Sequence, residues 1–205
     1  NLRSTAGAPG AISFNPTTAT LTLGNLTGSQ ASASSNVWTL LGSNTGNAVT
    51  GIISNGGSGG LTSAVQKSST STWTLSGANT YTGKSQINNG TLNVSSLNSV
   101  VGGSANSNLG APVTVALGTI DLGSAGLVGN LNYTGTGEIT DRVINLAGST
   151  GGAVITQAGT GLLKFTSTFT GSGSTTNDIT LQGSSNGEIA GGLPFVFRNL
   201  SKSGN

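Results

Sequence analysis

The sequence predicts an all-β fold and, within that class, a single-stranded parallel β-helix of roughly nine or ten turns. Three observations carry this prediction. Short runs in which apolar and polar residues alternate recur along most of the chain, as in β-strands. Gly, Asn and Ser separate these runs, and these residues favour turns. Residues of similar type recur at intervals of roughly 20 residues, as in a coil of stacked turns. No segment has the capped helical periodicity of an α-helix.

Twelve segments carry this alternation between turn residues, and each predicts a strand of roughly three to six residues. In chain order they are TLTLG (20–24), VWTLLG (37–42), VTGIIS (49–54), TWTLSG (72–77), GTLNVSS (90–96), APVTVALGTIDLG (111–123), LNYTG (131–135), DRVINLAG (141–148), GAVITQAG (152–159), GLLKFTSTFTG (161–171), DITLQG (178–183) and PFVFRNL (194–200).

The spacing of these strands favours a β-helix over a sandwich or barrel. A sandwich would favour two-residue hairpin turns and charged edge strands, whereas a β-helix repeats residue types from turn to turn. The recurring pairs are Trp73 with Leu92, Leu75 with Val94 and Ile144 with Leu163, each nineteen apart, and Leu21 with Trp38, seventeen apart. Turns of roughly 20 residues, each rising about 4.8 Å, would build a rod about 45 Å long.

The composition supports a folded chain that carries little chemistry. Only 6% of the residues are charged, against roughly 25% in ordinary domains. Disorder is the alternative for such a Gly-rich chain, but 34% of the residues are hydrophobic and they cluster in strands. Low charge also suits stacked turns, because like charges would lie on one another, whereas Asn, Ser and Thr form hydrogen-bonded ladders.

The charge and hydropathy patterns point away from several partners. The net charge is +2, with no basic stripe, so we expect no nucleic-acid binding. No apolar run in the sequence is long enough to span a bilayer, so we expect no membrane insertion in this segment. Cys, Met and His are all absent, which suits an oxidising exterior, and we expect an extracellular or cell-surface location.

We expect no enzymatic activity, cofactor or metal. Without His, the common general base near neutral pH is missing. Glu138 and Asp141 form the only close acidic pair, with Arg142 beside them; we interpret them as a surface turn whose charges neutralise one another rather than as a glycosidase pair. No GGxGxD repeat for calcium occurs. Trp38, Trp73, Tyr81 and Phe165 are candidate core aromatics, the alternative being a sugar-stacking platform.

The segments TWTLSGANTYTG (72–83) and NNGTLNV (88–94) resemble the autotransporter-associated β-strand repeat, also called the passenger-associated transport repeat. Stretches 42–61, 133–173 and 179–193 resemble other parts of the same large bacterial surface proteins. The resemblance implies a right-handed parallel β-helix outside the cell, within a longer chain of repeats. It implies a structural unit without catalytic residues. VQKSSTSTW (65–73) departs from the usual run before the Trp.

We expect one continuous β-helix over residues 1–205, with an irregular or capping segment (1–17), repeat-like turns (18–193) and a C-terminal strand or contact segment (194–205). Neither end offers a capping helix, so exposed edges would invite pairing. The candidate assembly contacts are Phe14, Phe195, Val196, Phe197 and Leu200. We therefore expect a structural module of a bacterial fibre or stalk that stacks head to tail on copies of itself or on neighbouring repeats. The alternative is an adhesin passenger that binds glycans.

Overall fold

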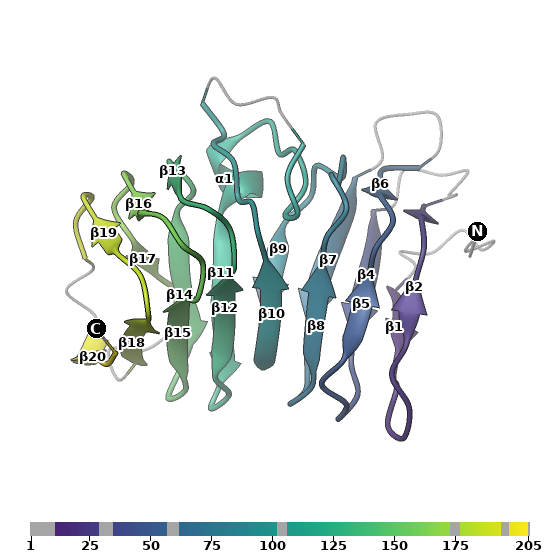
Figure 1. Ribbon diagram of the computed structural model, residues 1–205, viewed down its shortest axis with the longest axis horizontal. Helices are drawn as coiled ribbons and strands as arrows, with labels where there is room; N and C mark the ends of the chain where they lie inside the picture. The colour runs from purple at the N-terminus through teal and green to yellow at the C-terminus, as the bar shows by residue number, and fades with distance from the viewer. Residues whose placement is uncertain are drawn as a thin grey trace.

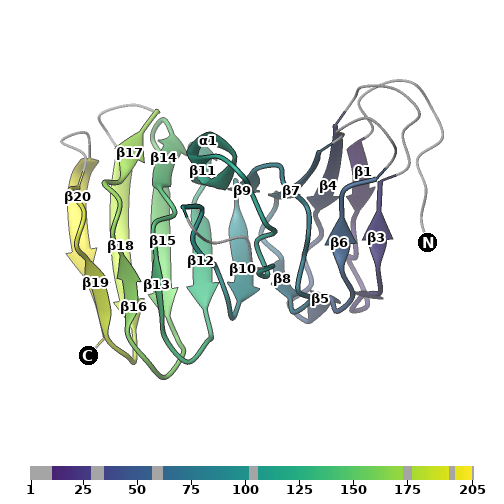
Figure 2. The same ribbon diagram turned by 90° about the horizontal axis from the view of Figure 1, so that it is seen from above.

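The computed structural model describes residues 11–28, 35–56, 62–101, 106–172, 177–193 and 197–204. Every pairing between named strands in these ranges is parallel. The strands lie side by side in chain order, and the colours run evenly from one end of the molecule to the other (Figures 1 and 2). The predicted parallel β-helix is confirmed.

The coil has three sides. Two are long sheets, which we call sheet A and sheet B, and the third is divided into a two-stranded and a three-stranded sheet. Sheet A contains β1 (Ala11–Phe14), β4 (Asn36–Leu40), β7 (Ser63–Lys67), β9 (Ser85–Ile87), β11 (Ile120–Ala125), β14 (Ile144–Gly148) and β17 (Thr170–Gly171). Sheet B contains β2 (Thr22–Leu23), β5 (Asn47–Val49), β8 (Thr72–Leu75), β10 (Gly90–Val94), β12 (Gly129–Tyr133), β15 (Gly152–Gln157), β18 (Asn177–Gly183) and β20 (Phe197–Lys202).

The third side contains β3 (Leu26–Thr27) paired with β6 (Ile53–Ser54), and then β13 (Glu138–Thr140), β16 (Leu163–Phe165) and β19 (Gly187–Ile189). Between these two small sheets, residues 95–119 connect β10 to β11, and we call the described part of this connection, 95–101 and 106–119, the excursion. The only helix in the described residues, α1 (Val115–Gly118), ends this excursion. It lies beside β11 in both views (Figures 1 and 2).

The register confirms part of the predicted recurrence. Trp73 is paired with Leu92, and Leu75 with Val94. Ile144, however, belongs to sheet A and Leu163 to the third side. The predicted pairing of these two residues is therefore wrong. The predicted pairing of Leu21 with Trp38 is also wrong, because the strand that follows Leu21 is in sheet B and Trp38 is in sheet A.

Most turns are longer than predicted. Along sheet B, paired residues are 26 apart from Asn47 to Trp73, 19 from Trp73 to Leu92, and 26 from Ile155 to Leu181. The longest sheet has eight strands in the described residues, fewer than the nine or ten turns predicted. The third side explains the difference, because the chain must also cross this side, where five strands lie in the described residues, and turn another corner.

One predicted strand is partly replaced by a helix. The segment 111–123 forms a strand only from Ile120. Before it, Thr114 caps α1, and its side chain accepts a hydrogen bond from the Leu117 amide at 3.3 Å. The expectation that no segment is helical is therefore wrong by one short turn.

The core is a set of columns that run along the inside of the coil. In sheet B the central interior column is Trp73, Leu92, Leu131, Ile155 and Leu181, one residue per turn. All except Leu181 are buried. Because each member lies on its neighbour at strand spacing, the interior is a continuous apolar stack.

Candidate functional site

The predicted acidic pair binds backbone amides of the excursion. The Glu138 carboxylate accepts a hydrogen bond from the Leu97 amide at 2.8 Å and another from the Asn98 amide. The Asp141 carboxylate accepts from Val100 at 2.6 Å and from Val101 at 2.8 Å. The two side chains therefore stand where a neighbouring strand would otherwise offer carbonyl oxygens to these amides.

Arg142 is buried beneath the same excursion, with 1% of its surface exposed. Its guanidinium donates to the carbonyl oxygens of Leu109 at 3.0 Å and of Gly110 and Gly118 at 3.4 Å. Burial lowers the pKa of this guanidinium. The interpretation of Glu138, Asp141 and Arg142 as a self-neutralising surface turn thus differs from the structure: these three side chains, which we call the clamp, hold the excursion on the rod.

The outer face of sheet B carries an uncharged polar ladder. Asn93 donates from its side-chain amide to the Thr74 hydroxyl at 3.1 Å, and Asn132 donates to the Asn93 side-chain oxygen at 2.9 Å. Further along, Gln182 donates to the Thr156 hydroxyl at 3.0 Å. These residues are half-buried and outward-facing, so sheet B presents amides and hydroxyls to its surroundings.

Sheet A carries a second outer ladder that contains a charge. The Asp121 side chain, 8% exposed, pairs with Lys84 at 3.1 Å. It also accepts hydrogen bonds from Gln86 at 3.3 Å and from Asn145 at 2.8 Å. Since every oxygen of this carboxylate has a partner, Asp121 joins neighbouring turns.

Lys67 occupies an interior position, in register with Leu40 and Ile87. Its ammonium donates to the carbonyl oxygens of Ser69 at 2.6 Å and Asn89 at 3.0 Å. Burial lowers its pKa to about 8. The alternation in SAVQK places Lys67 on the inward face with Ser63 and Val65, and this is the sequence signal for the buried ammonium.

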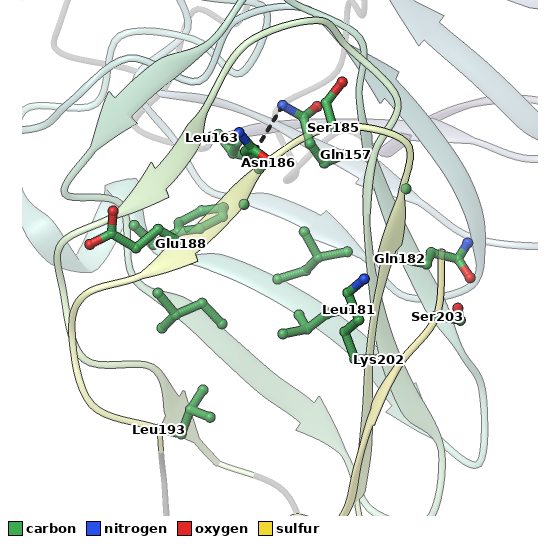
Figure 3. A pocket seen from close by; sticks show the side chains of 15 residues that line it. Gln157, Leu163, Leu181, Gln182, Ser185, Asn186, Glu188, Leu193, Lys202 and Ser203 are labelled. Atoms are coloured by element: carbon green, nitrogen blue, oxygen red, sulfur yellow. Dashed lines mark hydrogen bonds between the residues drawn. The ribbon is translucent and has the colours of Figure 1, made fainter. Parts of the chain in front are cut away.

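A hollow of about 400 Å³ opens at the C-terminal end of the coil. Figure 3 shows Leu163, Leu181 and Leu193 around the same space, with Lys202 beside Leu181. Gln157 closes one wall by donating to the carbonyl oxygens of Gly161 and Asn186 at 2.5 and 3.5 Å. In this part of the structure, β20 ends sheet B and β19 ends the third side. We call this end, with β17, β19, β20 and the hollow, the C-terminal face.

The five predicted assembly residues do not share one environment in the structure. Leu200 is 47% exposed on β20, in register with the buried Ile179. Phe14 is mostly buried, with its ring stacked on that of Trp38 at a centroid distance of 6.3 Å. Phe197 begins β20, but its side chain is outside the described residues. Phe195 and Val196 also lie outside them.

The predicted core aromatics face the interior, and each has a defined partner, which for Trp38 is the stacked ring of Phe14. The Trp73 indole donates to the Leu41 carbonyl at 2.8 Å, and the Tyr81 hydroxyl is 2.7 Å from the Ser85 hydroxyl. Phe165 packs edge to face on Phe169 with centroids 5.4 Å apart. Trp38 is fully buried. None of these four rings is exposed for stacking on a sugar.

Within the described ranges, no three His, Cys, Asp or Glu side chains gather as metal ligands would. Over the same residues, no helix has the length and apolarity needed to cross a membrane.

Residues 65–94 match the family model of the passenger-associated-transport-repeat. The predicted resemblance is therefore confirmed for this stretch, which covers most of β7, all of β8 and β9, and β10. No curated protein and no solved structure matches the chain. The matched repeat contains the short step from Trp73 to Leu92, so a turn close to the predicted length lies in the stretch that the family model recognises.

Proposed function

We propose that this chain is a structural module of a bacterial passenger protein, located outside the cell or on its surface, and that it stacks end to end on further copies of itself. The passenger-associated-transport-repeat at 65–94 supports the passenger assignment and the secreted or surface location. The module has no catalytic role and uses no cofactor.

The observation that carries the stacking is the C-terminal face. There, Leu200 extends an interior column past Ile179 with nearly half of its surface exposed. The hollow beside it is lined by Leu163, Leu181 and Leu193. An exposed strand edge next to an apolar hollow has the two properties that a further parallel turn requires: backbone groups to pair and a core to continue.

The opposite end offers matching chemistry. Residues 11–66 contain no charged side chain, so β1, β2 and β3 lack the charges that commonly block edge pairing. Each interchain hydrogen bond would contribute about 1 kcal/mol, and apolar burial about 25 cal/mol per Å². These gains must exceed an association cost of roughly 4–15 kcal/mol. A head-to-tail contact that does not close produces a filament.

Sedimentation velocity over a range of concentrations tests this function. We expect the wild-type protein to sediment faster as its concentration rises, and Leu200→Asp to stay monomeric. Val113→Asp is the matched control, because Val113 is 74% exposed but lies on the excursion. If Leu200→Asp associates as the wild type does, the C-terminal face is not the interface.

A second candidate function rests on the outer ladder of sheet B. Its uncharged amides and hydroxyls, such as those of Asn93 and Asn132, are groups that hydrogen-bond sugar hydroxyls, and this supports the alternative of a glycan-binding adhesin. A glycan array with wild type, Asn132→Ala and the sheet A control Gln66→Ala separates the two functions. Saturable binding lost only in Asn132→Ala supports adhesion, whereas no binding by the wild type excludes it for the glycans on the array.

A further inference from the structure

Lys202 places a charge at an interior position of the coil. It is paired with Leu181, which continues the apolar column of Leu92, Leu131 and Ile155. Side chains at the paired position point to the same face of a sheet. The last strand of sheet B in the described residues therefore ends this apolar column with a cation.

Among the residues that the structure describes, no carboxylate forms an ion pair with the ammonium of Lys202. Its Nζ atom donates to the Gly204 carbonyl oxygen at 2.7 Å and is exposed. None of the three ion pairs in the described chain includes it. Glu188, the acidic residue that lines the hollow, is paired with Lys164 at 2.8 Å. Figure 3 shows Lys202 beside Leu181, with Glu188 across the hollow.

A second copy stacked on this face would bury that ammonium. Burying a charge without a partner is costly, and the strands of the incoming end have no acid to offer, since residues 11–66 carry no charge. An inward-pointing charge on an edge strand is one of the devices that limit edge-to-edge pairing.

We infer that Lys202 is a gatekeeper of the C-terminal face: its charge opposes stacking on this face and so keeps the self-association of the module weak. This inference rests on the proposed stacking function and adds to it the residue that sets its strength. Neutralising Lys202 leaves the exposed Leu200 and the apolar hollow in place and removes the main obstacle to a further turn.

The experiment compares dissociation constants for self-association of the wild type, Lys202→Met, Lys202→Arg and Arg198→Met, measured by sedimentation equilibrium. Lys202→Arg keeps the charge. Arg198→Met removes a charge from the same strand, where Arg198 is exposed and paired with Asp178. We expect Lys202→Met to associate at least about tenfold more tightly than the wild type, and both controls to remain within about threefold of it.

Each outcome has one reading. Tighter association of Lys202→Met alone supports the gatekeeper. Equal association of the wild type and Lys202→Met overturns the gatekeeper and leaves stacking intact. Weaker association of Lys202→Met overturns it too, by making Lys202 a favourable contact. If neither the wild type nor Lys202→Met associates at any concentration, both the stacking function and the gatekeeper are wrong. Tightening by Arg198→Met to the same degree would assign the effect to net charge and overturn the specific role of Lys202.

Discussion

The guanidinium of Arg142 donates a hydrogen bond to the carbonyl oxygen of Leu109, 33 residues earlier in the chain, at 3.0 Å. The same guanidinium reaches Gly110 and Gly118. A buried cation that bonds only backbone oxygens is a strong local tie, because removing it takes a charged donor from each of them. The Gly110 oxygen also accepts from Ser107, so the loss falls mainly on the oxygens of Leu109 and Gly118.

Arg142→Ala should destabilise the protein by about 3 kcal/mol, from unpaired carbonyls and an unfilled cavity. Urea unfolding measures the loss, and hydrogen exchange should show that residues 107–118 lose protection first. Arg198→Ala is the control, since Arg198 is exposed and its loss should leave the unfolding midpoint nearly unchanged. A midpoint for Arg142→Ala equal to that of the wild type would contradict the clamp.

Asp141→Asn should weaken the other half of the clamp. The substitution keeps the shape of the side chain but removes the charge and one of the two acceptors for the amides of Val100 and Val101. We expect a cost of about 1–2 kcal/mol and faster exchange of these two amides. The amide of Thr134, which donates to Val94 at 2.7 Å, serves as an internal reference. If it accelerates equally, the effect is global and the local tie is not supported.

Stacked corners leave no room for a side chain at Gly159. A Cβ atom there would lie 2.0 Å from the carbonyl oxygen of Gly135 in the turn below, so Gly159→Ala should cost roughly 1–3 kcal/mol or more. Gly24→Ala is the matched control, because a Cβ at Gly24 meets nothing within 4 Å. The difference in melting temperature between the two variants measures the effect, and equal melting temperatures would argue against this corner packing.

Lys67 should make stability rise with pH. Its pKa is about 8 in the folded protein against 10.5 in the unfolded chain. Between these values the unfolded chain binds more protons, so the free energy of unfolding increases with pH by up to about 1.4 kcal/mol per unit. Below about pH 8 both states are protonated and the slope vanishes.

Urea unfolding from about pH 8 to 9.5 tests this slope. That range avoids Tyr81, whose pKa burial raises to about 12; above pH 10 the unfolded tyrosine ionises first and stability falls. Lys67→Met should remove the rise, since Met fits between Leu40 and Ile87 in the interior column. A rise of equal slope in Lys67→Met would assign it to another group.

Much of the fold was predictable because strand alternation and residue recurrence are local signals. The pairing of Trp73 with Leu92 follows from a short turn with tight corners. The other turns were not predictable in length, because corners and the third side take variable numbers of residues and leave the alternation unchanged. The turn that contains the excursion separates Leu92 from Leu131 by 39 positions.

The clamp could not be predicted for a related reason. In the sequence, Glu138 and Asp141 are noticed for their closeness to each other, but their partners lie far earlier in the chain, at Leu97 and Val100. Only the coil brings the two segments together. The interior position of Lys202 could not be predicted either, because it depends on a bulge in β20. Phe197 pairs with Asn177 and Asn199 with Asp178, so the strand has one extra residue between them.

Small-angle X-ray scattering of the wild-type protein over increasing concentration tests end-to-end stacking most directly. Rods that join at their ends should increase in maximum dimension by whole particle lengths while the radius of gyration of their cross-section stays constant. A maximum dimension that stays constant at every concentration, or a cross-section that thickens as the particles grow, would contradict the proposed assembly.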